Sequence, residues 1–361
     1  MADSARLLID TLRFAPPDDA RALATAWSAA DAGAIVRLVE YEGVALWLHR
    51  RLKSLGVTLD GEPRVRLAAG ARHATAHSLR TDAEATASLA ILSAAGVPAV
   101  LLKGAAMRRI AARVRDADAR ASSDVDLIVP ADLAQHAWDA LVASGYSPPK
   151  TSGPADGHHL PALAGPIGIA VEIHTTTVAA TPGAEAWRRA SHDGDAVLAV
   201  SSDTELLWNA VAHAVVTAAD AGRSGVRLRY WLDPAALLAS STTIDWDRIR
   251  ARLLSSECAF PDLARVWLRT ASDLAGVALP EDALGNERAN RFDLERVLSW
   301  RLRVLARPDQ KSRWVEKLLE EGARGEVSLP IEPPHRAAST PARLRHAVAS
   351  RAARLWWVIH R

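Results

Sequence analysis

Apolar and polar positions along the first 90 residues repeat with the spacing of amphipathic helices. Segments such as 20–27 and 44–52 are rich in Ala, Leu and Arg, and their apolar residues recur three and four positions apart. That spacing places apolar side chains on one face of a helix. The stretch from about 63 to 95 predicts one long helix that ends at Gly96, because glycine is the usual residue just past a helix end.

The pattern changes between residues 96 and 174. Two short apolar runs, 97–102 and 124–129, predict strands, and residues 169–174 predict a third because their apolar and polar side chains alternate. Two segments between them predict helices: about 105–114, and from about 131 to Gly145. Residues 147–168 are rich in Gly, Pro and His and predict a loop. Strands that alternate with helices are typical of an α/β core.

From Asp203 onward the pattern is helical again, with Asp245 as an expected N-cap. Six arginines and no acidic residue follow Glu332, so the chain ends on a basic segment. We expect that segment to be a helix packed on the body, with an anionic partner, nucleic acid or a membrane surface as alternatives. The chain thus divides into four expected parts: an N-terminal helical region 1–95, a core 96–200, a C-terminal helical domain 201–324, and a linker with the basic helix 325–361.

Two carboxylates stand at the head of the second predicted strand. Residues i and i+2 of a strand point to the same side, so Asp124 and Asp126 would face one point while Val125 and Leu127 are buried. Carboxylates that close repel each other unless a cation lies between them. Converging carboxylate oxygens suit Mg²⁺, which also binds water and substrate phosphates. The segment therefore predicts a metal site for phosphoryl-type chemistry.

Other residues of the core complete this set. Lys103 and Gly104 end the first predicted strand, where a glycine lets the backbone approach a phosphate and a lysine adds a charge. Glu172 is a lone acid on the third predicted strand, on the same face as His174, which would bind substrate or orient Glu172. If the sheet brings Glu172 beside the aspartate pair, three acids and a phosphate cradle lie together. Those are the parts that metal-assisted nucleotidyl transfer needs.

Composition narrows the setting. The chain has 361 residues, 49% of them apolar, and a single cysteine, Cys258, which excludes a disulfide framework and a Cys-rich zinc site. The net charge of +2 does not favour nucleic acid as a partner. There is no apolar run of about 18 residues and no signal-peptide pattern at Met1, so we expect a cytoplasmic protein without a membrane span.

The ordered motifs resemble a known family. The segments that carry the resemblance are 101–104 (LLKG), 120–129 (RASSDVDLIV), 145–146 (GY), 171–174 (VEIH) and the later 206–213, 227–233 and 244–246. Together they look like the uncharacterised bacterial nucleotidyltransferase family of the DNA polymerase β superfold, over roughly residues 20–290. The resemblance implies an α/β (α+β) fold, with a polymerase β-like core around a small mixed sheet, flanked by N- and C-terminal helical regions.

The resemblance also implies a reaction and a site. The reaction is transfer of a nucleotidyl group from an NTP, with Mg²⁺ or Mn²⁺, to an acceptor that the sequence does not identify. The metal and catalytic residues would be Asp124, Asp126 and Glu172. The nucleotide-binding residues would be Lys103, Gly104, Ser122, Ser123, His174, Arg227 and Arg229. The superfold usually has Gly-Ser at the phosphate turn, whereas here Ala105 follows Gly104, so Lys103, Ser122 or Ser123 would supply that contact.

Several polar residues also have structural interpretations. We expect His213 to be a core histidine and Asp233, which precedes Pro234, to be a helix cap. Arg227 and Arg229 would clamp a triphosphate or pair with surface acids. The remaining polar positions are expected in loops near the site: Asp116 and Asp118 in a solvated loop at its mouth, and His158 and His159 in a loop over the cleft.

Two other classes of function stay open on the sequence. One is a sugar or phosphate transferase on the same scaffold that modifies a peptide or natural product. The other is a non-catalytic protein, such as an antitoxin or adaptor, that keeps a nucleotide pocket. Mass spectrometry separates the transferases, because a nucleotide, a phosphate and a hexose add different masses.

Overall fold

The structure is a computed structural model of the chain. The residues that it describes are 2–17, 19–111, 114, 116–149, 159–177, 183–192, 199–220, 227–241, 243–255, 258, 260–284 and 294–306. The helices are α1 Ala2–Leu12, α2 Ala20–Ala29, α3 Ala32–Glu42, α4 Ala45–Ser54, α5 Gly61–Ala94, α6 Lys103–Arg109, η1 Ala117–Ala119, η2 Ala131–Leu133, α7 Ala134–Ala143, α8 Gly183–Arg188, α9 Asp203–Asp220, α10 Arg229–Ser240, α11 Trp246–Leu254, α12 Pro261–Ala275 and α13 Leu294–Ala306. The strands are β1 Val100–Leu101, β2 Asp124–Ile128, β3 Leu163–Ala164, β4 Ala170–His174, β5 Ala190–His192 and β6 Ala199–Ser201.

A small mixed sheet organises the core, and the predicted fold class is confirmed. Its strand order is β3-β4-β2-β1-β6-β5. The central strand β2 runs parallel to β4 and antiparallel to β1. The parallel register pairs Asp126 with Glu172 and Ile128 with His174. Alternation along β4 buries Val171 and Ile173, which leaves Glu172 and His174 together on the other face, as the sequence predicts.

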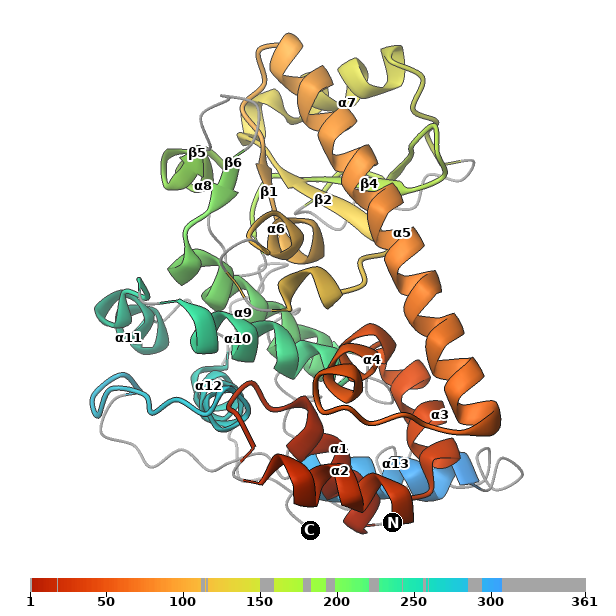
Figure 1. Ribbon diagram of the computed structural model, residues 1–361. Helices are drawn as coiled ribbons and strands as arrows, with labels where there is room; N and C mark the ends of the chain where they lie inside the picture. The colour runs from red at the N-terminus through yellow and green to blue at the C-terminus, as the bar shows by residue number, and fades with distance from the viewer. Residues whose placement is uncertain are drawn as a thin grey trace, which may run out of the picture.

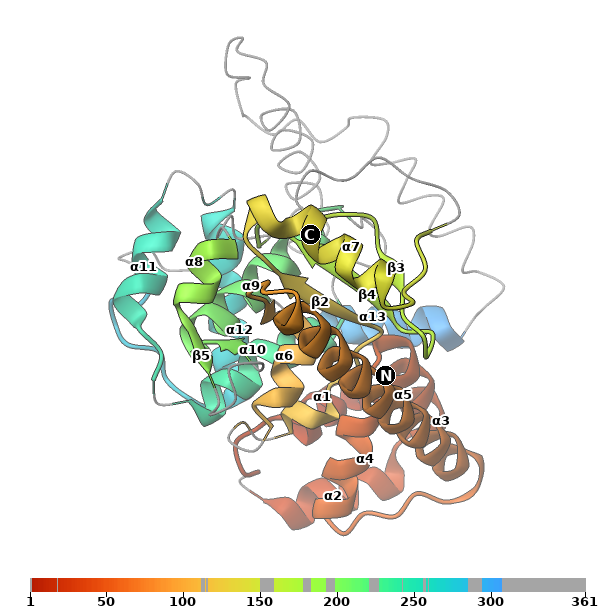
Figure 2. The same cartoon turned by 90° about the horizontal axis from the view of Figure 1, so that it is seen from above.

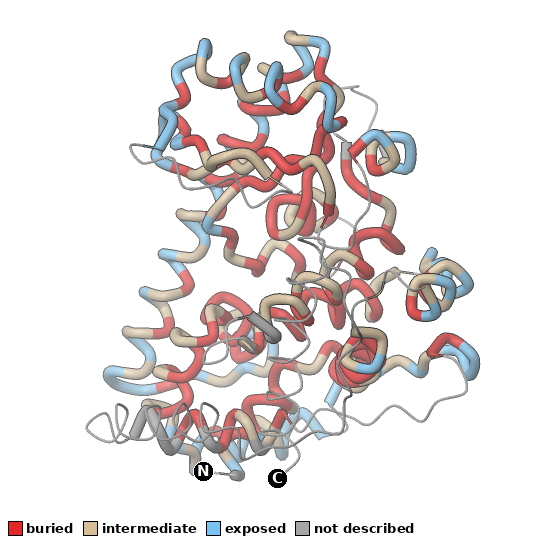
Figure 3. The backbone as a smooth tube through the Cα atoms, turned by 180° about the vertical axis from the view of Figure 1, so that it is seen from behind, coloured by how far each residue is buried: buried red, intermediate tan, exposed pale blue. Residues whose placement is uncertain are grey.

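The long helix α5 connects the N-terminal helices to the sheet. It contacts α3 and α4 at one end and α6, α7 and β2 at the other, and it runs along one side of the molecule in Figure 1. Seen from above, α9 to α12 form a group apart from α1 to α4 (Figure 2). Buried positions gather where these helices meet each other and the sheet, while the outer side of α5 stays exposed (Figure 3).

A buried ion pair joins the N-terminal helix α3 to the last described helix, α13. The Glu42 side chain at the end of α3 has no exposed surface; its Oε1 lies 2.5 Å from Arg301 Nη1 on α13. Its Oε2 accepts a hydrogen bond of 2.6 Å from the backbone N–H of Leu228, just before α10. Burial raises the pKa of Glu42 despite these partners. The contact therefore ties α3, α10 and α13 together.

The structure corrects the interpretation of Asp233 as a helix cap. Asp233 lies inside α10, which continues through Pro234. Proline has no N–H, so the carbonyl of Tyr230 four residues earlier loses its helical partner. The indole Nε1 of Trp267 donates to that carbonyl at 3.1 Å instead. A contact from α12 thus satisfies the acceptor that Pro234 leaves open.

Local signals placed most helix ends well. The long helix ends at Ala94 and Gly96 follows with a φ of +71°, and Asp245 caps α11 by accepting from the N–H of Arg248. The first predicted strand is shorter than expected, and the helix after it starts at Lys103 and ends at Arg109. The expected loop 147–168 contains the short strand β3. His158, the linker and the basic C-terminal segment lie outside the described residues.

The described helices were also compared with the length and apolarity that a membrane span requires. No single described helix is both long enough and apolar enough to span a membrane. One sharply bent pair, α2 with α3, reaches the required length and apolarity when the two helices are taken together.

The four-part domain division stays a prediction.

Candidate functional site

Two carboxylates and an imidazole meet on one face of β2 and β4. Asp126, Glu172 and His174 each offer an atom that could ligate a metal, and these atoms lie within 4.8 Å of one another. His174 Nε2 is 2.9 Å from Asp126 Oδ1 and 3.4 Å from Glu172 Oε2. Asp126 and His174 are almost fully buried, whereas 27% of the Glu172 side chain is exposed. The site is thus open on the Glu172 side.

The His174 imidazole lowers the pKa of both carboxylates. Burial alone would raise the pKa of Asp126, but the hydrogen bond from His174 and the charge of Lys103 hold that pKa below its usual range. The same imidazole lowers the pKa of Glu172. Burial would lower the pKa of His174, yet its two carboxylate partners raise it. At neutral pH both carboxylates are therefore ionised, with His174 Nε2 directed at them as a donor.

Lys103 completes the cluster from α6. Its Nζ is 2.5 Å from Asp126 Oδ1, and 24% of the side chain is exposed. Although burial opposes the ammonium charge, the carboxylates raise the pKa of Lys103. Its backbone φ is +48°, a left-handed conformation that non-glycine residues rarely adopt. The sheet thus brings Lys103, Asp126, Glu172 and His174 together.

Asp124 lies beside this cluster without joining the set of close ligand atoms. It is half-buried, two residues before Asp126 on β2. Burial and the charge of Asp126 raise the pKa of Asp124, and Glu172 adds to that shift. The sequence predicted Asp124, Asp126 and Glu172 as metal ligands; the set of close ligand atoms consists of Asp126, Glu172 and His174. Asp124 as a metal ligand stays a prediction.

The residues fit a divalent cation. Asp126 Oδ2 is a buried oxygen without a hydrogen-bond partner, and a buried acceptor of this kind is costly unless something binds it. It lies in a group with a second carboxylate, which supplies the hard oxygen ligands that Mg²⁺ and Mn²⁺ prefer. Since His174 Nε2 points at the carboxylates, the imidazole holds these ligands in a fixed orientation.

The turn beside Lys103 requires a glycine for lack of space. A Cβ on Gly104 would lie 2.6 Å from Ser122 Oγ and 2.8 Å from Ser122 Cβ. Ser122 is buried and donates from its hydroxyl to the backbone carbonyl of Asp124, whereas Ser123 is exposed. Ala105 is buried in the apolar core and has no hydroxyl, so it does not make the contact that the serine makes in the superfold. Ser122 and Ser123 stay predictions as nucleotide-binding residues.

Arg120 is a buried arginine at the start of the segment 120–129, and the sequence alone predicted no role for it. Its Nε donates to Asp233 Oδ2 at 3.0 Å, and its Nη1 would lie 3.2 Å from a Cβ on Gly104. Its charge also acts on Asp124. The signal in the sequence is an arginine four residues before the start of the acidic strand. Its partner, 113 residues away, has no local signal.

The three other predicted polar residues lie on or just before the C-terminal helices. His213 is half-buried on α9 and meets the Tyr230 ring edge to face at 5.6 Å between centroids. Burial and the charge of Lys103 lower the pKa of His213 to about 3, so this histidine is neutral. Arg229 donates to the Tyr230 hydroxyl at 3.0 Å, and Arg227 lies over the ring of Tyr41. Both arginines stay predictions as nucleotide-binding residues.

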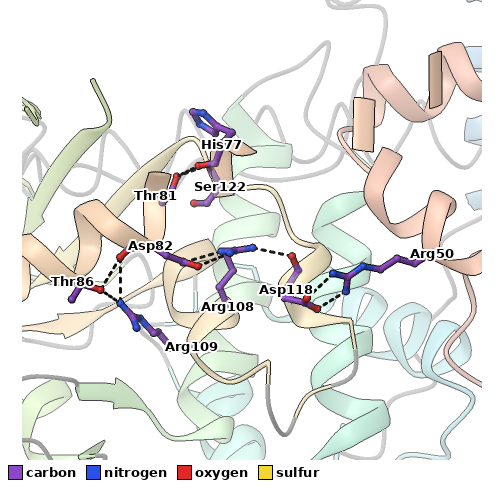
Figure 4. A network of polar contacts seen from close by, with 9 residues as sticks. All are labelled: Arg50, His77, Thr81, Asp82, Thr86, Arg108, Arg109, Asp118 and Ser122. Atoms are coloured by element: carbon purple, nitrogen blue, oxygen red, sulfur yellow. Dashed lines mark hydrogen bonds and ion pairs between the residues drawn. The ribbon is translucent and has the colours of Figure 1, made fainter. Parts of the chain in front are cut away.

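A network on α5 holds the segments that carry the site (Figure 4). Arg108 of α6 donates to both carboxylate oxygens of Asp82 on α5 and, at 2.9 Å, to the backbone carbonyl of Asp118. The Thr81 hydroxyl lies 3.1 Å from the Ser122 carbonyl and donates to it. Helix α5 therefore fixes both α6, which begins at Lys103, and the segment that leads into β2.

The sequence predicted two loops near the site, one with Asp116 and Asp118 and one with His158 and His159. Asp116 pairs with the buried Arg51 of α4 at 3.3 Å, whereas Asp118 pairs with Arg50 and keeps 43% of its side chain exposed. The prediction of a solvated loop was wrong for Asp116, because its partner lies far away in the sequence. His159 lies beside the site, with its ring 5.3 Å from that of His174.

Comparison with known proteins identifies the family of the chain. A search of curated proteins and a search of solved structures each found no match. Among protein families, the one described as "Uncharacterised nucleotidyltransferase" matches residues 28–268. That range spans both the N-terminal helices and the sheet, and it ends in α12. The chain therefore belongs to the uncharacterised nucleotidyltransferase family.

Proposed function

We propose that this protein transfers a nucleotidyl group from an NTP to a hydroxyl, or a similar nucleophile, on a small molecule, peptide or protein. The family supports nucleotidyl transfer in general. The observation that carries the specific proposal is the β2–β4 register, which sets Asp126 opposite Glu172 with His174 between their carboxylates. We place the reaction at this face of the sheet, and the protein in the cytoplasm.

Each residue of the site has a proposed part. Asp126 and Glu172 would hold Mg²⁺ or Mn²⁺, with Asp124 as a further ligand. A bound divalent cation supplies charge neutralisation at the phosphates and a lower pKa for the attacking hydroxyl. Ionised Glu172, on the open side of the site, would take the proton of the acceptor hydroxyl. His174 orients both carboxylates.

The bond changes follow from the leaving group. The acceptor oxygen forms a bond to the α-phosphorus, the bond from that phosphorus to the α–β bridging oxygen breaks, and pyrophosphate leaves. The positive groups that act on Asp124 are Lys103 and Arg120, which would stabilise the phosphate charge. The further nucleotide-binding residues that we propose are Gly104, Ser122, Ser123, Arg227 and Arg229.

A binding and mass screen tests this proposal. The four NTPs are titrated with Mg²⁺ or Mn²⁺ present, and the NTP that binds is then incubated with candidate acceptors. We expect an acceptor to gain the mass of a nucleoside monophosphate. A gain of one phosphate or one hexose would assign a different transferase. Nucleotide binding that ignores the metal, with no mass gain on any acceptor, would assign a non-catalytic nucleotide-binding protein.

A further inference from the structure

One carboxylate oxygen at the site already has a cation. The Lys103 ammonium lies 2.5 Å from Asp126 Oδ1, which also accepts from His174 Nε2 at 2.9 Å. Asp126 is fully buried, so Lys103 neutralises a carboxylate that water does not reach. The charges of Glu172 and Asp124 attract the same ammonium. Lys103 thus occupies the position where the acids of the site concentrate their negative potential.

An ammonium and a divalent cation cannot share this position without cost. Both prefer the same buried carboxylate, and at a separation of a few ångströms they repel each other. Displacement of the ammonium is feasible, because Lys103 carries its charge on a flexible four-carbon stem and its side chain is partly exposed. What it needs is another anion to receive the ammonium, since an unpaired charge in a half-buried site is unfavourable.

We propose that Lys103 is a built-in counter-ion of Asp126 that competes with the divalent metal, so that metal binding requires a nucleotide to draw the ammonium away. This inference rests on the proposed function, because the receiving anion is the triphosphate of the substrate. In the free protein, Lys103 keeps the affinity for divalent metal low. When the triphosphate pairs with Lys103, the ammonium no longer repels a cation at Asp126, and metal and nucleotide bind cooperatively.

The first test measures Mn²⁺ affinity without nucleotide, by calorimetry and by the electron paramagnetic resonance signal of free Mn²⁺. Lys103→Gln removes the charge but keeps a hydrogen-bond donor for Asp126. We expect this variant to bind Mn²⁺ at least about tenfold more tightly than wild type, since a neighbouring charge commonly changes the ion affinity of a carboxylate by that factor or more. Lys103→Arg keeps the charge and should stay close to wild type. Lys53→Gln, at an exposed lysine of α4, is the matched control.

The second test measures the coupling. The affinity for each of the four α,β-methylene nucleoside triphosphates, in which the α–β bridge cannot be cleaved, is determined with and without Mn²⁺. By linkage this ratio equals the effect of nucleotide on metal affinity. We expect the ratio to be large in wild type and in Lys53→Gln, and at least about fivefold smaller in Lys103→Gln.

The outcomes separate this inference from the proposed function. Equal Mn²⁺ affinity in wild type and Lys103→Gln, with equal coupling, overturns the role of Lys103 and leaves the metal site standing. Absence of Mn²⁺ binding in every variant, with and without nucleotide, overturns the metal assignment on which both proposals rest. Adding Asp126→Asn to Lys103→Gln must abolish the tighter binding, because the competition is for that carboxylate. Circular dichroism and thermal unfolding verify that each variant is folded.

Discussion

Asp126 and Glu172 lie directly opposite each other in the parallel pairing of β2 with β4, and a single imidazole nitrogen of His174 faces both carboxylates. Two buried or half-buried acids are held in one orientation by a shared donor. Such an arrangement keeps both carboxylates ionised and ready for a cation. It also makes His174 a positioning residue for both.

The first prediction concerns that imidazole. His174→Phe keeps an aromatic ring but removes the donor, so Asp126 and Glu172 lose their orientation. We expect Mn²⁺ affinity and the transfer rate each to fall about 10–100-fold, the usual effect of losing a residue that orients metal ligands. Mn²⁺ titration and a transfer assay measure the two effects. His136→Phe, at an exposed histidine of α7, is the control, and loss of affinity in both variants alike would contradict the assignment.

The second prediction uses the neutral state of His213. Its pKa is lowered to about 3 in the folded protein, mainly by burial, whereas an unfolded histidine has a pKa of about 6.5. Below that value the unfolded state binds more protons, so the stability contribution is complete above about pH 6.5 and is lost as the pH falls. Between about pH 7 and pH 5.5 the loss is about 1 kcal/mol.

Urea unfolding of wild type and His213→Gln at the two pH values checks this. The free energy of unfolding should change less with pH in the variant, by about that amount. An identical pH dependence in the two proteins would show that His213 is not the group responsible.

The third prediction concerns the buried pair of Arg120 and Asp233. Each of the two side chains is no more than 10% exposed, and Asp233 Oδ1 has no hydrogen-bond partner. Removing one charge leaves the other buried and unpaired, so Asp233→Asn should lower the free energy of unfolding by about 3 kcal/mol. The double variant Arg120→Met, Asp233→Leu should lose less than this single variant, because it leaves no unpaired charge. Denaturant unfolding measures both, and a larger loss in the double variant would refute the account.

The fourth prediction concerns the attachment of α6 to α5. Arg108→Gln and Asp82→Asn each break the bidentate ion pair, whose arginine is 8% exposed. If the two residues act through that pair, their effects on the free energy of unfolding are not additive. The effect of the double variant should differ from the sum of the two single effects by a coupling energy of about 1–2 kcal/mol. A double-mutant cycle on the free energy of unfolding measures it. A coupling energy near zero would mean that the pair does not fix α6.

Whether a contact could be predicted from the sequence depends on how far apart its two partners lie along the chain. The face shared by Glu172 and His174 follows from alternation along one strand, so the local pattern is sufficient. The cap at Asp245 is equally local. The partner of Arg120 is 113 residues away, and those of Asp116 and Asp118 lie on α4. No local pattern specifies such contacts, because they depend on how the helices pack.

The cap prediction at Asp233 failed for a related reason. Proline usually ends a helix because it has no N–H, which leaves the carbonyl four residues earlier without its helical partner. Here that carbonyl accepts from Trp267 on α12, so tertiary packing overrides the local rule. For the metal site, spacing on β2 indicated Asp124 and Asp126, and the sheet register sets the predicted third acid, Glu172, opposite Asp126. Asp124 as a metal ligand stays a prediction.

The central claim is that Asp126 supports nucleotidyl transfer, and one labelling experiment tests it most directly. Wild type, Asp126→Asn and the exposed control Asp132→Asn are incubated with Mn²⁺, an acceptor fraction and an NTP that carries ³²P at either the α or the γ position. The account predicts that wild type and Asp132→Asn transfer the α label and not the γ label, with pyrophosphate released, and that Asp126→Asn is slower by at least about a hundredfold while its thermal unfolding stays cooperative. Transfer by Asp126→Asn at the wild-type rate, or transfer of the γ label, would contradict it.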